Sequence, residues 1–418
     1  MKRRAFLLTA AAGVARSVRA QRPSAPPSGS LPESIRKLRP MTDGIKPITG
    51  EERQARIEKA RRLMRDNQLG AIVLEGGSSL FYFTGLRLPV GDPPSVLVLP
   101  AKGDPTWIVS VSDTRAAGAV HDGDLRTYRA GESAFAAVAA ALRDRGASSG
   151  RVGVEERVRF GVYDGLRQTA PSLEYVSADP VTIGCRVIKS PAELALLQRA
   201  NDITLACYRA VYDTMREGMT QAEVRGYISA GYRALGANGA AMVSFGKYTA
   251  FPHGSIEEQM LKEGDFVLID DGCSVEGYQS DITRTFIFGK PTQRQRDVWA
   301  LERKAQDAAL AAAKPGATCE SVDAAARKVI TDAGFGPGYK VPGLPHRTGH
   351  GIGLDGHEWT YLVKGNKTKL QPGMCFSDEP MIAIYGEFGV RLEDCMYITE
   401  SGARTFTTQS QSIDQPFG

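Results

Sequence analysis

The chain has 418 residues, of which 42% are apolar and 24% are charged, and its formal net charge is +5. These values are ordinary for a soluble globular protein, and the length allows two domains with a large core. Residues 1–20 hold five basic side chains and no acidic ones, so the chain beyond them is formally neutral. This neutrality argues against a nucleic-acid-binding function.

The first twenty residues are typical of an export signal. Lys2, Arg3 and Arg4 precede an uncharged run, and small residues surround Arg19 at a cleavage position. The run is too short to span a bilayer, so the sequence predicts a cleaved signal peptide over residues 1–20 and no stable membrane span. The paired arginines resemble a twin-arginine signal, which predicts a periplasmic location. A basic disordered tail is the alternative.

Residues 21–50 are rich in proline and serine, which is typical of a linker or a surface arm. Residues 51–180 then alternate helical and strand patterns, which predicts a small amino-terminal α/β domain without a chemical motif. His121, alone beside Asp122, is interpreted as a surface residue. The predicted strands include 71–74, 96–99, 108–111 and 152–154, and a helix is predicted at 134–145.

Residues 181–410 are predicted to form the second domain, with four helices that each begin at a serine or threonine. Three of these starts are capping boxes, in which glutamate or glutamine follows the hydroxyl residue by three positions. The helices also repeat, because Gly218 and Gly236 recur 98 residues later as Gly316 and Gly334. The helices are predicted over 190–216, 220–236, 292–314 and 318–334.

A hairpin over residues 266–288 carries two carboxylates, Asp270 at the end of an apolar run and Asp281 in the second strand. By itself this hairpin fits solvated turn acids as well as a metal site. A later strand pair, however, carries Glu379 and Glu393 in a similar way. Two duplicated halves packed about a pseudo-twofold axis would bring all four carboxylates to one point, which predicts a shared metal centre.

Four of the five histidines lie near glycine, proline or carboxylates: His253, His346, His350 and His357. Four carboxylates with one or two imidazoles suit a pair of Mn, Co, Fe or Zn ions. Two such ions, about 3.5–4 Å apart, can activate a water and polarise a carbonyl, which indicates hydrolysis, most naturally of an amide. The six cysteines form no CxxC pair and lie in apolar runs, which argues against a thiolate zinc site and favours free thiols.

These motifs resemble the pita-bread metallohydrolases, a family that includes aminopeptidase P, prolidase, methionine aminopeptidase and creatinase. Residues 51–180 also resemble the amino-terminal domain of the aminopeptidase P, prolidase and creatinase branch, so the resemblance covers most of the chain. It implies an α/β (α+β) fold: a small creatinase/prolidase-type amino-terminal α/β domain, followed by a pseudo-twofold pita-bread catalytic domain. It also implies two divalent ions, with Mn²⁺ expected before Co²⁺ or Zn²⁺. The implied metal ligands are Asp270, Asp281, His350, Glu379 and Glu393.

The resemblance assigns further roles around the metals. His253 matches a histidine beside the substrate amide, and His357 matches one that contacts the substrate carbonyl. His346 is typical of the proline-specific branch, and Arg391 matches an arginine that braces the site from behind the ligands. Glu379 is the candidate for accepting a proton from water and passing it to the leaving nitrogen. Gly356 departs from the proline-peptidase signature, which usually has Ile or Val there.

The expected activity is therefore hydrolysis of an amino-terminal Xaa-Pro bond by a metal-bridging hydroxide. The short spacing from Glu379 to Glu393 is closer to prolidase than to methionine aminopeptidase. Dipeptides and longer peptides both remain open as substrates, and a homodimer is expected by analogy. Two alternatives remain: a non-peptidase hydrolase of a small amide, ester or phosphotriester, and a non-catalytic binding protein.

Overall fold

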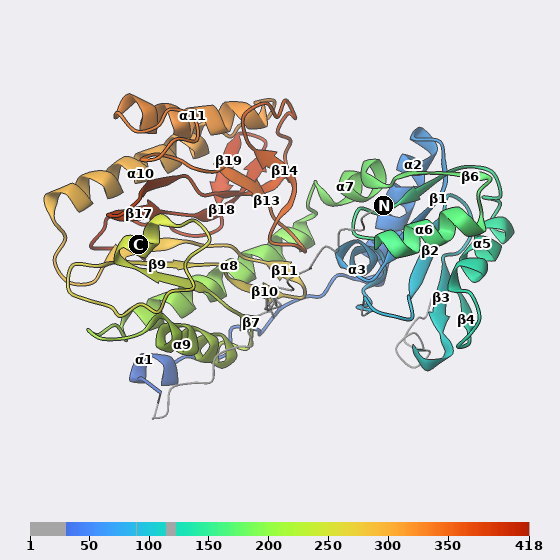
Figure 1. Cartoon of the computed structure of the whole chain (residues 1–418), viewed down its shortest axis with the longest axis horizontal. Coiled ribbons are helices and arrows are strands. Elements are labelled where there is room, and N and C mark those ends of the chain that lie inside the picture. The colour runs from blue at the N-terminus through green and yellow to red at the C-terminus, as the bar shows by residue number, and fades with distance from the viewer. Residues whose placement is uncertain (1–30, 89, 114–122, 418) are drawn as a thin grey trace, which may run out of the picture.

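The computed structural model describes residues 31–88, 90–113 and 123–417. Two lobes lie side by side in it, an amino-terminal lobe and a larger second lobe (Figure 1). The second is called the catalytic lobe below, because the resemblance predicts the metal site there. The predicted signal peptide and His121 lie outside the described residues. Among the described helices, none is both long enough and apolar enough to cross a membrane.

The amino-terminal lobe is built on a six-stranded mixed sheet with the order β4-β3-β2-β1-β5-β6. Its central strands are buried on both faces because helices cover both, which explains why these strands read as continuous apolar runs. The predicted α/β pattern is confirmed. The strands are β1 Leu69–Glu75, β2 Val96–Pro100, β3 Thr106–Ser110, β4 Asp124–Tyr128, β5 Gly150–Val154 and β6 Leu173–Ser177. The α-helices are α2 Gly50–Asp66, α3 Ser78–Thr84, α5 Ala134–Asp144, α6 Phe160–Thr169 and α7 Asp179–Arg186.

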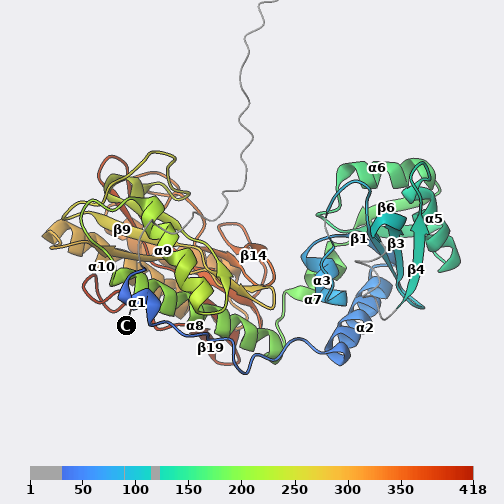
Figure 2. The same ribbon diagram turned by 90° about the horizontal axis from the view of Figure 1, so that it is seen from below.

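The segment before α2 runs along the catalytic lobe and then crosses to the amino-terminal one (Figure 2). Its short helix α1 (Glu33–Arg36) packs against α8 and α9 of the catalytic lobe and buries Ile35. The amide of Met41 donates a hydrogen bond of 2.9 Å to the carbonyl of Leu235. The described part of the predicted linker is thus an ordered arm on the catalytic lobe.

The catalytic lobe contains the four predicted helices in two pairs. Ser190, Thr220 and Thr292 each form a complete capping box. The first helix ends at Tyr212 rather than near residue 216, because the chain turns there and the Thr214 hydroxyl bonds to the carbonyl of Val211. The helices are α8 Pro191–Tyr212, α9 Gln221–Ala234, α10 Gln293–Ala312 and α11 Cys319–Asp332.

The strands of this lobe form two similar halves, in which β9 pairs with β12 and β15 pairs with β18. In the first half the strands are β7 Asn238–Gly239, β8 Met242–Phe245, β9 Phe266–Asp270, β10 Cys273–Val275, β11 Tyr278–Gln279 and β12 Arg284–Ile287. In the second they are β13 Gly349–Gly351, β14 Glu358–Leu362, β15 Cys375–Asp378, β16 Met381–Ile384, β17 Phe388–Arg391, β18 Asp394–Thr399 and β19 Gly402–Thr405.

The predicted single hairpin over residues 266–288 is wrong in one respect. It consists of an outer pair, β9 with β12, and an inner pair, β10 with β11, and Asp281 lies in the irregular segment between β11 and β12. The backbone at Asp271 has φ +101°, which ends the extended run of β9. A Cβ on Gly272 would lie 2.3 Å from the carbonyl oxygen of Ser280, so only glycine fits this close approach.

Candidate metal centre

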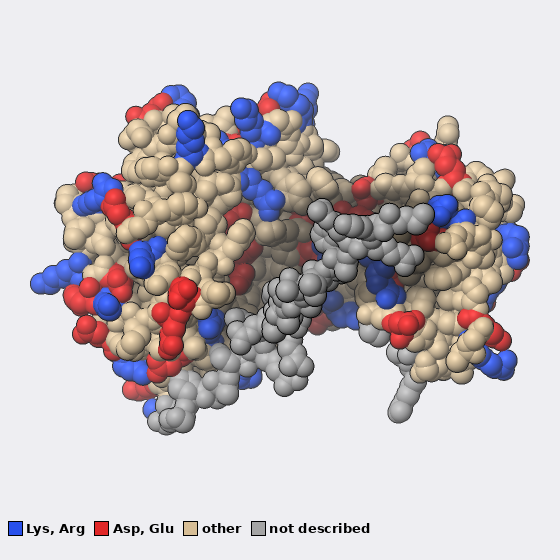
Figure 3. All heavy atoms as spheres, in the orientation of Figure 1, with Lys and Arg blue, Asp and Glu red and all other residues tan. Residues whose placement is uncertain are grey.

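The nine residues singled out in the sequence all line one cavity of about 550 Å³ in the catalytic lobe. Figure 3 shows acidic side chains within a hollow on this face of the lobe. The cavity wall is made by Pro252, His253, Asp270, Asp271, Asp281, His346, Arg347, His350, His357, Val363, Glu379, Arg391 and Glu393.

The carboxylates lie where strands end or are interrupted. Asp270 is the last residue of β9, and Glu379 directly follows β15. Asp281 precedes β12, and Glu393 lies between β17 and β18. Because β9 pairs with β12 and β15 pairs with β18, each half presents two acids at one edge. The two halves therefore converge as the internal repeat predicts.

The ligand atoms fall into overlapping groups whose members lie within 4.8 Å of one another. One group is Asp270, Asp281 and Glu393, and a second is His350, Glu379 and Glu393. A third joins Asp281 and His350 to His357. Asp281, Glu393 and His350 each belong to two groups, so the three groups form one continuous cluster that could hold two neighbouring ions.

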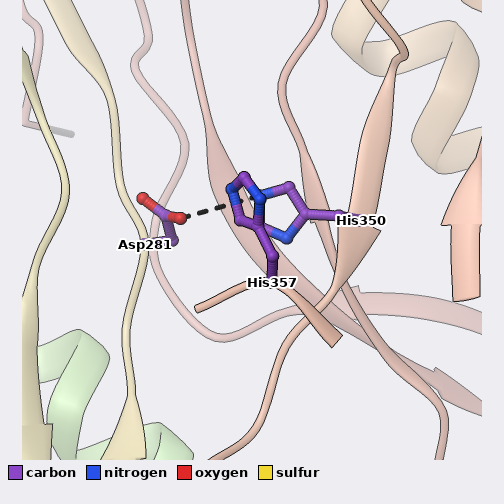
Figure 4. A group of neighbouring side chains, drawn as sticks. All are labelled: Asp281, His350 and His357. Atoms are coloured by element: carbon purple, nitrogen blue, oxygen red, sulfur yellow. Dashed lines mark ion pairs between the residues drawn. The ribbon is translucent and has the colours of Figure 1, made fainter. Parts of the chain in front are cut away.

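His350 presents a ring nitrogen to this cluster. Its Nδ1 lies 3.0 Å from the carbonyl oxygen of Gly351, so Nδ1 carries the proton and donates it there. Its Nε2 lies 3.3 Å from Oε1 of Glu379. The same nitrogen lies 3.7 Å from Oδ2 of Asp281, as Figure 4 shows. Burial lowers the pKa of His350 well below its usual value, so the ring is neutral. The lone pair on Nε2 and the carboxylate oxygens can only accept, so they have no donor between them. A cation placed between them could bind to both.

The carboxylates carry more negative charge than the surrounding protein balances. Burial and repulsion from neighbouring acids raise the pKa of Asp281 and Glu393 well above the usual value, and that of Glu379 to about 7. Arg391 forms an ion pair with Asp270, and Oε1 of Glu393 has no partner among the described residues. Hard oxygen ligands with one neutral imidazole fit a pair of divalent ions.

The remaining histidines surround the ligands. The ring centroids of His357 and His350 are 3.9 Å apart, and Nδ1 of His357 lies 3.0 Å from Nη2 of Arg347. His346 is held through Nδ1, 2.7 Å from the carbonyl oxygen of Arg347, and its Nε2 has no partner among the described residues. Burial lowers the pKa of His346 to about 3. Burial also lowers the pKa of His357, so the rings of His346 and His357 are neutral groups that can donate or accept hydrogen bonds at the cavity wall.

Known proteins share this architecture over most of the chain. The profile described as metallopeptidase family M24 matches residues 195–400, and the creatinase/prolidase N-terminal domain matches residues 56–188. An Xaa-Pro dipeptidase from Lactobacillus delbrueckii subsp. lactis is 31% identical over 369 residues, which cover 85% of this chain and 98% of that protein. The chain belongs to metallopeptidase family M24.

Solved structures agree with this membership of family M24. Dipeptidase PepE from Mycobacterium ulcerans matches with a TM-score of 0.81 and 31% identity, covering 88% of this chain and 98% of that one. The X-Pro aminopeptidase from Thermotoga maritima MSB8 matches with a TM-score of 0.71 and 26% identity, covering 84% of this chain and 99% of that one. The predicted pita-bread architecture is confirmed, and the chain is a metallopeptidase with a dinuclear divalent metal centre.

Three residues of this M24 site were not singled out in the sequence. The hydroxyl of Thr283 lies 2.5 Å from Asp270 and 2.7 Å from Glu393 and so links the two halves. The sequence feature that could have pointed to Thr283 is its position two residues after Asp281. Arg347 follows His346 directly, and Asp271 looked like a turn residue. Burial and the neighbouring Asp270 raise the pKa of Asp271 to about 7.

Proposed function

We propose that this metallopeptidase hydrolyses the bond between an amino-terminal residue and a following proline. The observation that carries the proposal is the cavity itself, where five metal-ligand candidates and four further site residues meet. The names of relatives matched over nearly their whole length support a peptide substrate rather than an ester or phosphotriester. Their names also include both dipeptidases and an aminopeptidase, so the substrate length is the finer question.

The donor set would be filled by Asp270, Asp281, His350, Glu379 and Glu393. Two divalent ions there would supply a Lewis acid for the scissile carbonyl and lower the pKa of a water.

The residues around the donor set orient the ligands. Arg391 and Thr283 hold Asp270 from behind, since Nε of Arg391 donates to the Thr283 hydroxyl at 3.1 Å while its Nη2 pairs with Asp270. The carbonyl of Gly351 fixes the tautomer of His350. These contacts keep the ligand oxygens and nitrogen aimed at one point before substrate arrives.

His357 and Glu379 are placed to handle the substrate. Arg347 can only donate, so Nδ1 of His357 accepts and the neutral ring carries its proton on Nε2. That Nε2–H is a donor for the carbonyl oxygen of the scissile bond, where negative charge develops. Glu379 lies in the same cavity, where its carboxylate can accept a proton from a water and return it to the leaving nitrogen.

We further propose that the metal is Mn²⁺, that the protein is exported to the periplasm and that it forms a homodimer. The oxygen-rich donor set supports Mn²⁺, and the basic, apolar and small-residue pattern of residues 1–20 supports export. Metal analysis of protein purified from its native host, sequencing of its mature amino terminus and light scattering test these points. A complete amino terminus on exported protein would contradict the cleaved signal.

The test of function is release of the first residue from an Xaa-Pro dipeptide and from an Xaa-Pro-Yaa tripeptide, with added Mn²⁺. A matched Xaa-Ala dipeptide is the control for proline specificity. We expect turnover of at least one proline substrate and little of the control. Cleavage of the dipeptide alone makes the protein a prolidase, and cleavage of the tripeptide makes it an aminopeptidase P. Inactivity on both with metal bound would overturn the proposal.

A further inference from the structure

The segment that carries His357 is held by the amino-terminal lobe. His357 lies in an irregular stretch immediately before β14, between Gly356 and Glu358, where the backbone makes no regular ladder. Glycines at positions 353 and 356 add freedom to this stretch. Its backbone bonds are at Gly353, which donates to the carbonyl of Asp355 at 3.1 Å and accepts from the amide of Gln279 at 2.7 Å. Beyond the contact of His357 with Arg347, the stretch is held by side-chain bonds on either side of His357.

On one flank, Asp355 accepts hydrogen bonds from three residues of the amino-terminal lobe. Oδ1 lies 2.7 Å from Oγ of Ser78 and 2.9 Å from Nη1 of Arg157, and Oδ2 lies 2.6 Å from Nη2 of Arg186. Charge-assisted bonds of this kind are shorter and stronger than neutral ones. Asp355 thus ties the stretch to α3, to α7 and to the loop after β5.

On the other flank, Glu358 is held by two cations. Nζ of Lys189 lies 2.8 Å from its Oε2, and Arg186 forms an ion pair with its Oε1. The same Oε1 accepts from the backbone amides of Leu354 at 2.8 Å and Asp355 at 3.2 Å, which closes the stretch on itself. Among the described residues, Arg186 bonds to both flanks of His357.

The network is shielded from water, so its geometry is well defined. The side chains of Arg186, Asp355 and Glu358 are 11%, 15% and 5% exposed. Desolvated ion pairs are weakly screened, and losing one partner leaves the others to rearrange. Without Arg186, Asp355 would keep only Ser78 and Arg157 as side-chain partners among the described residues, and Glu358 would keep only Lys189. No described side chain of the amino-terminal lobe would then bond to both flanks of His357.

We propose that Arg186 is a positioning residue through which the amino-terminal lobe sets the place of His357 beside the scissile carbonyl. The inference rests on the proposed function, because it assigns His357 to the substrate. Arg186 does not line the metal cavity. Among the described residues its side chain bonds to the Ser79 hydroxyl at 3.0 Å, within its own lobe, and otherwise to Asp355 and Glu358, so it reaches His357 through the stretch between them. A displacement of about 1 Å at such a group can cost about 100-fold in rate.

The first test is a double-substitution cycle on the full, metal-loaded enzyme. We expect Arg186→Gln to lower kcat by about 10–100-fold with a small change in KM and unchanged metal content. In a His357→Ala background the same substitution should cost less than about 3-fold, because its target is gone. Arg151→Gln, which breaks an exposed pair with Glu174 and a bond to the carbonyl of Asn67 in the same lobe, is the matched control and should leave activity unchanged, because neither partner contacts the stretch at His357. Equal losses in both backgrounds, or full kcat in Arg186→Gln, would overturn the proposal.

A second test does not depend on activity. Hydrogen exchange of the peptide covering residues 353–359 should speed up in Arg186→Gln and stay at the wild-type rate in Arg151→Gln. If Arg186→Gln does not fold, Asp355→Asn makes the same test with a milder change. Arg186→Lys should retain more of kcat than Arg186→Gln, because lysine keeps the charge but loses the bidentate hydrogen bonding of the guanidinium. Lack of activity of the wild-type protein on Xaa-Pro peptides would refute the proposed function. Wild-type exchange rates in Arg186→Gln and in Asp355→Asn would refute the positioning role alone.

Discussion

Two glutamates near the candidate site, both largely shielded from water, have pKa values that shift in opposite directions. Glu379 lies at the metal centre and is 12% exposed, and Glu358 lies in the contact with the amino-terminal lobe and is 5% exposed. Burial raises the pKa of Glu379 to about 7, and the Asp270 carboxylate adds to this. Burial acts in the same direction on Glu358, but Lys189 and Arg186 outweigh it and lower its pKa to about 2.

The difference shows that burial alone does not determine the charge of a carboxylate. Glu358 has two cations in direct contact, so it is a finished structural ion pair. Glu379 shares its cavity with Asp270, Asp281 and Glu393, and its direct partners in the described part of the chain are Ser377 and the neutral His350. The metal cavity around Glu379 therefore lacks positive charge, and a pair of divalent ions would supply it.

The largest expected effect comes from removing a ligand from the cluster with excess negative charge. Asp281→Asn or His350→Ala should lower kcat/KM by at least roughly 10⁴-fold, since metal-bound charge stabilisation contributes several kcal/mol. In metal-free protein, however, Asp281→Asn should raise the melting temperature, because it removes one of several repelling carboxylates. Activity and thermal unfolding with and without chelator measure both effects. Wild-type turnover in either variant would contradict the assignment of the metal ligands.

A smaller effect, on stability, is expected at the balanced site. Glu358→Ala should destabilise the protein by about 3–5 kcal/mol, because it leaves Lys189 and Arg186 with an unpaired buried charge. Denaturant unfolding at neutral pH measures the loss, and Glu387→Ala, which removes an exposed partner of Arg294, is a matched control expected within about 1 kcal/mol. Equal stability of the two variants would show that the contact between the lobes is not a buried ion pair.

The sequence predicted those parts of the site that depend on local pattern. Capping boxes at Ser190, Thr220 and Thr292 were visible because they need only residues three positions apart. The convergence of Asp270 and Glu379 followed from an internal repeat, since similar halves place similar residues at equivalent strand ends.

The rest depends on tertiary contacts that a linear pattern does not encode. Asp281 was expected in a strand, but the left-handed backbone at Asp271 divides the hairpin and leaves Asp281 in an irregular segment. The bond from Arg186 to Asp355 spans 169 residues, and nothing near either residue marks the other. The sequence analysis assigned no role to Arg186, because its bonds to Asp355 and Glu358 on the two flanks of His357 exist only in the folded chain.

The smallest expected effect is the pH dependence of metal binding, which separates the two glutamates directly. A carboxylate with a raised pKa in the folded protein stays protonated until the pH passes that pKa, and a metal must displace the proton. Apparent affinity should therefore rise with pH, by at most about tenfold per pH unit for each proton displaced, and the part of this slope that Glu379 contributes should end at about pH 7 as Glu379 ionises. The raised pKa values of Asp281 and Glu393 add contributions of their own. His350 adds no step there, because its lowered pKa keeps it neutral. Calorimetric titration between pH 5.5 and 8 measures the slope on both sides of the raised pKa of Glu379, which is about 7. Glu379→Gln should weaken binding and flatten the slope, whereas Glu358→Gln should leave the slope unchanged, since Glu358 is fully ionised throughout. Equal slopes in both variants would mean that the two carboxylates do not differ in the way their surroundings indicate.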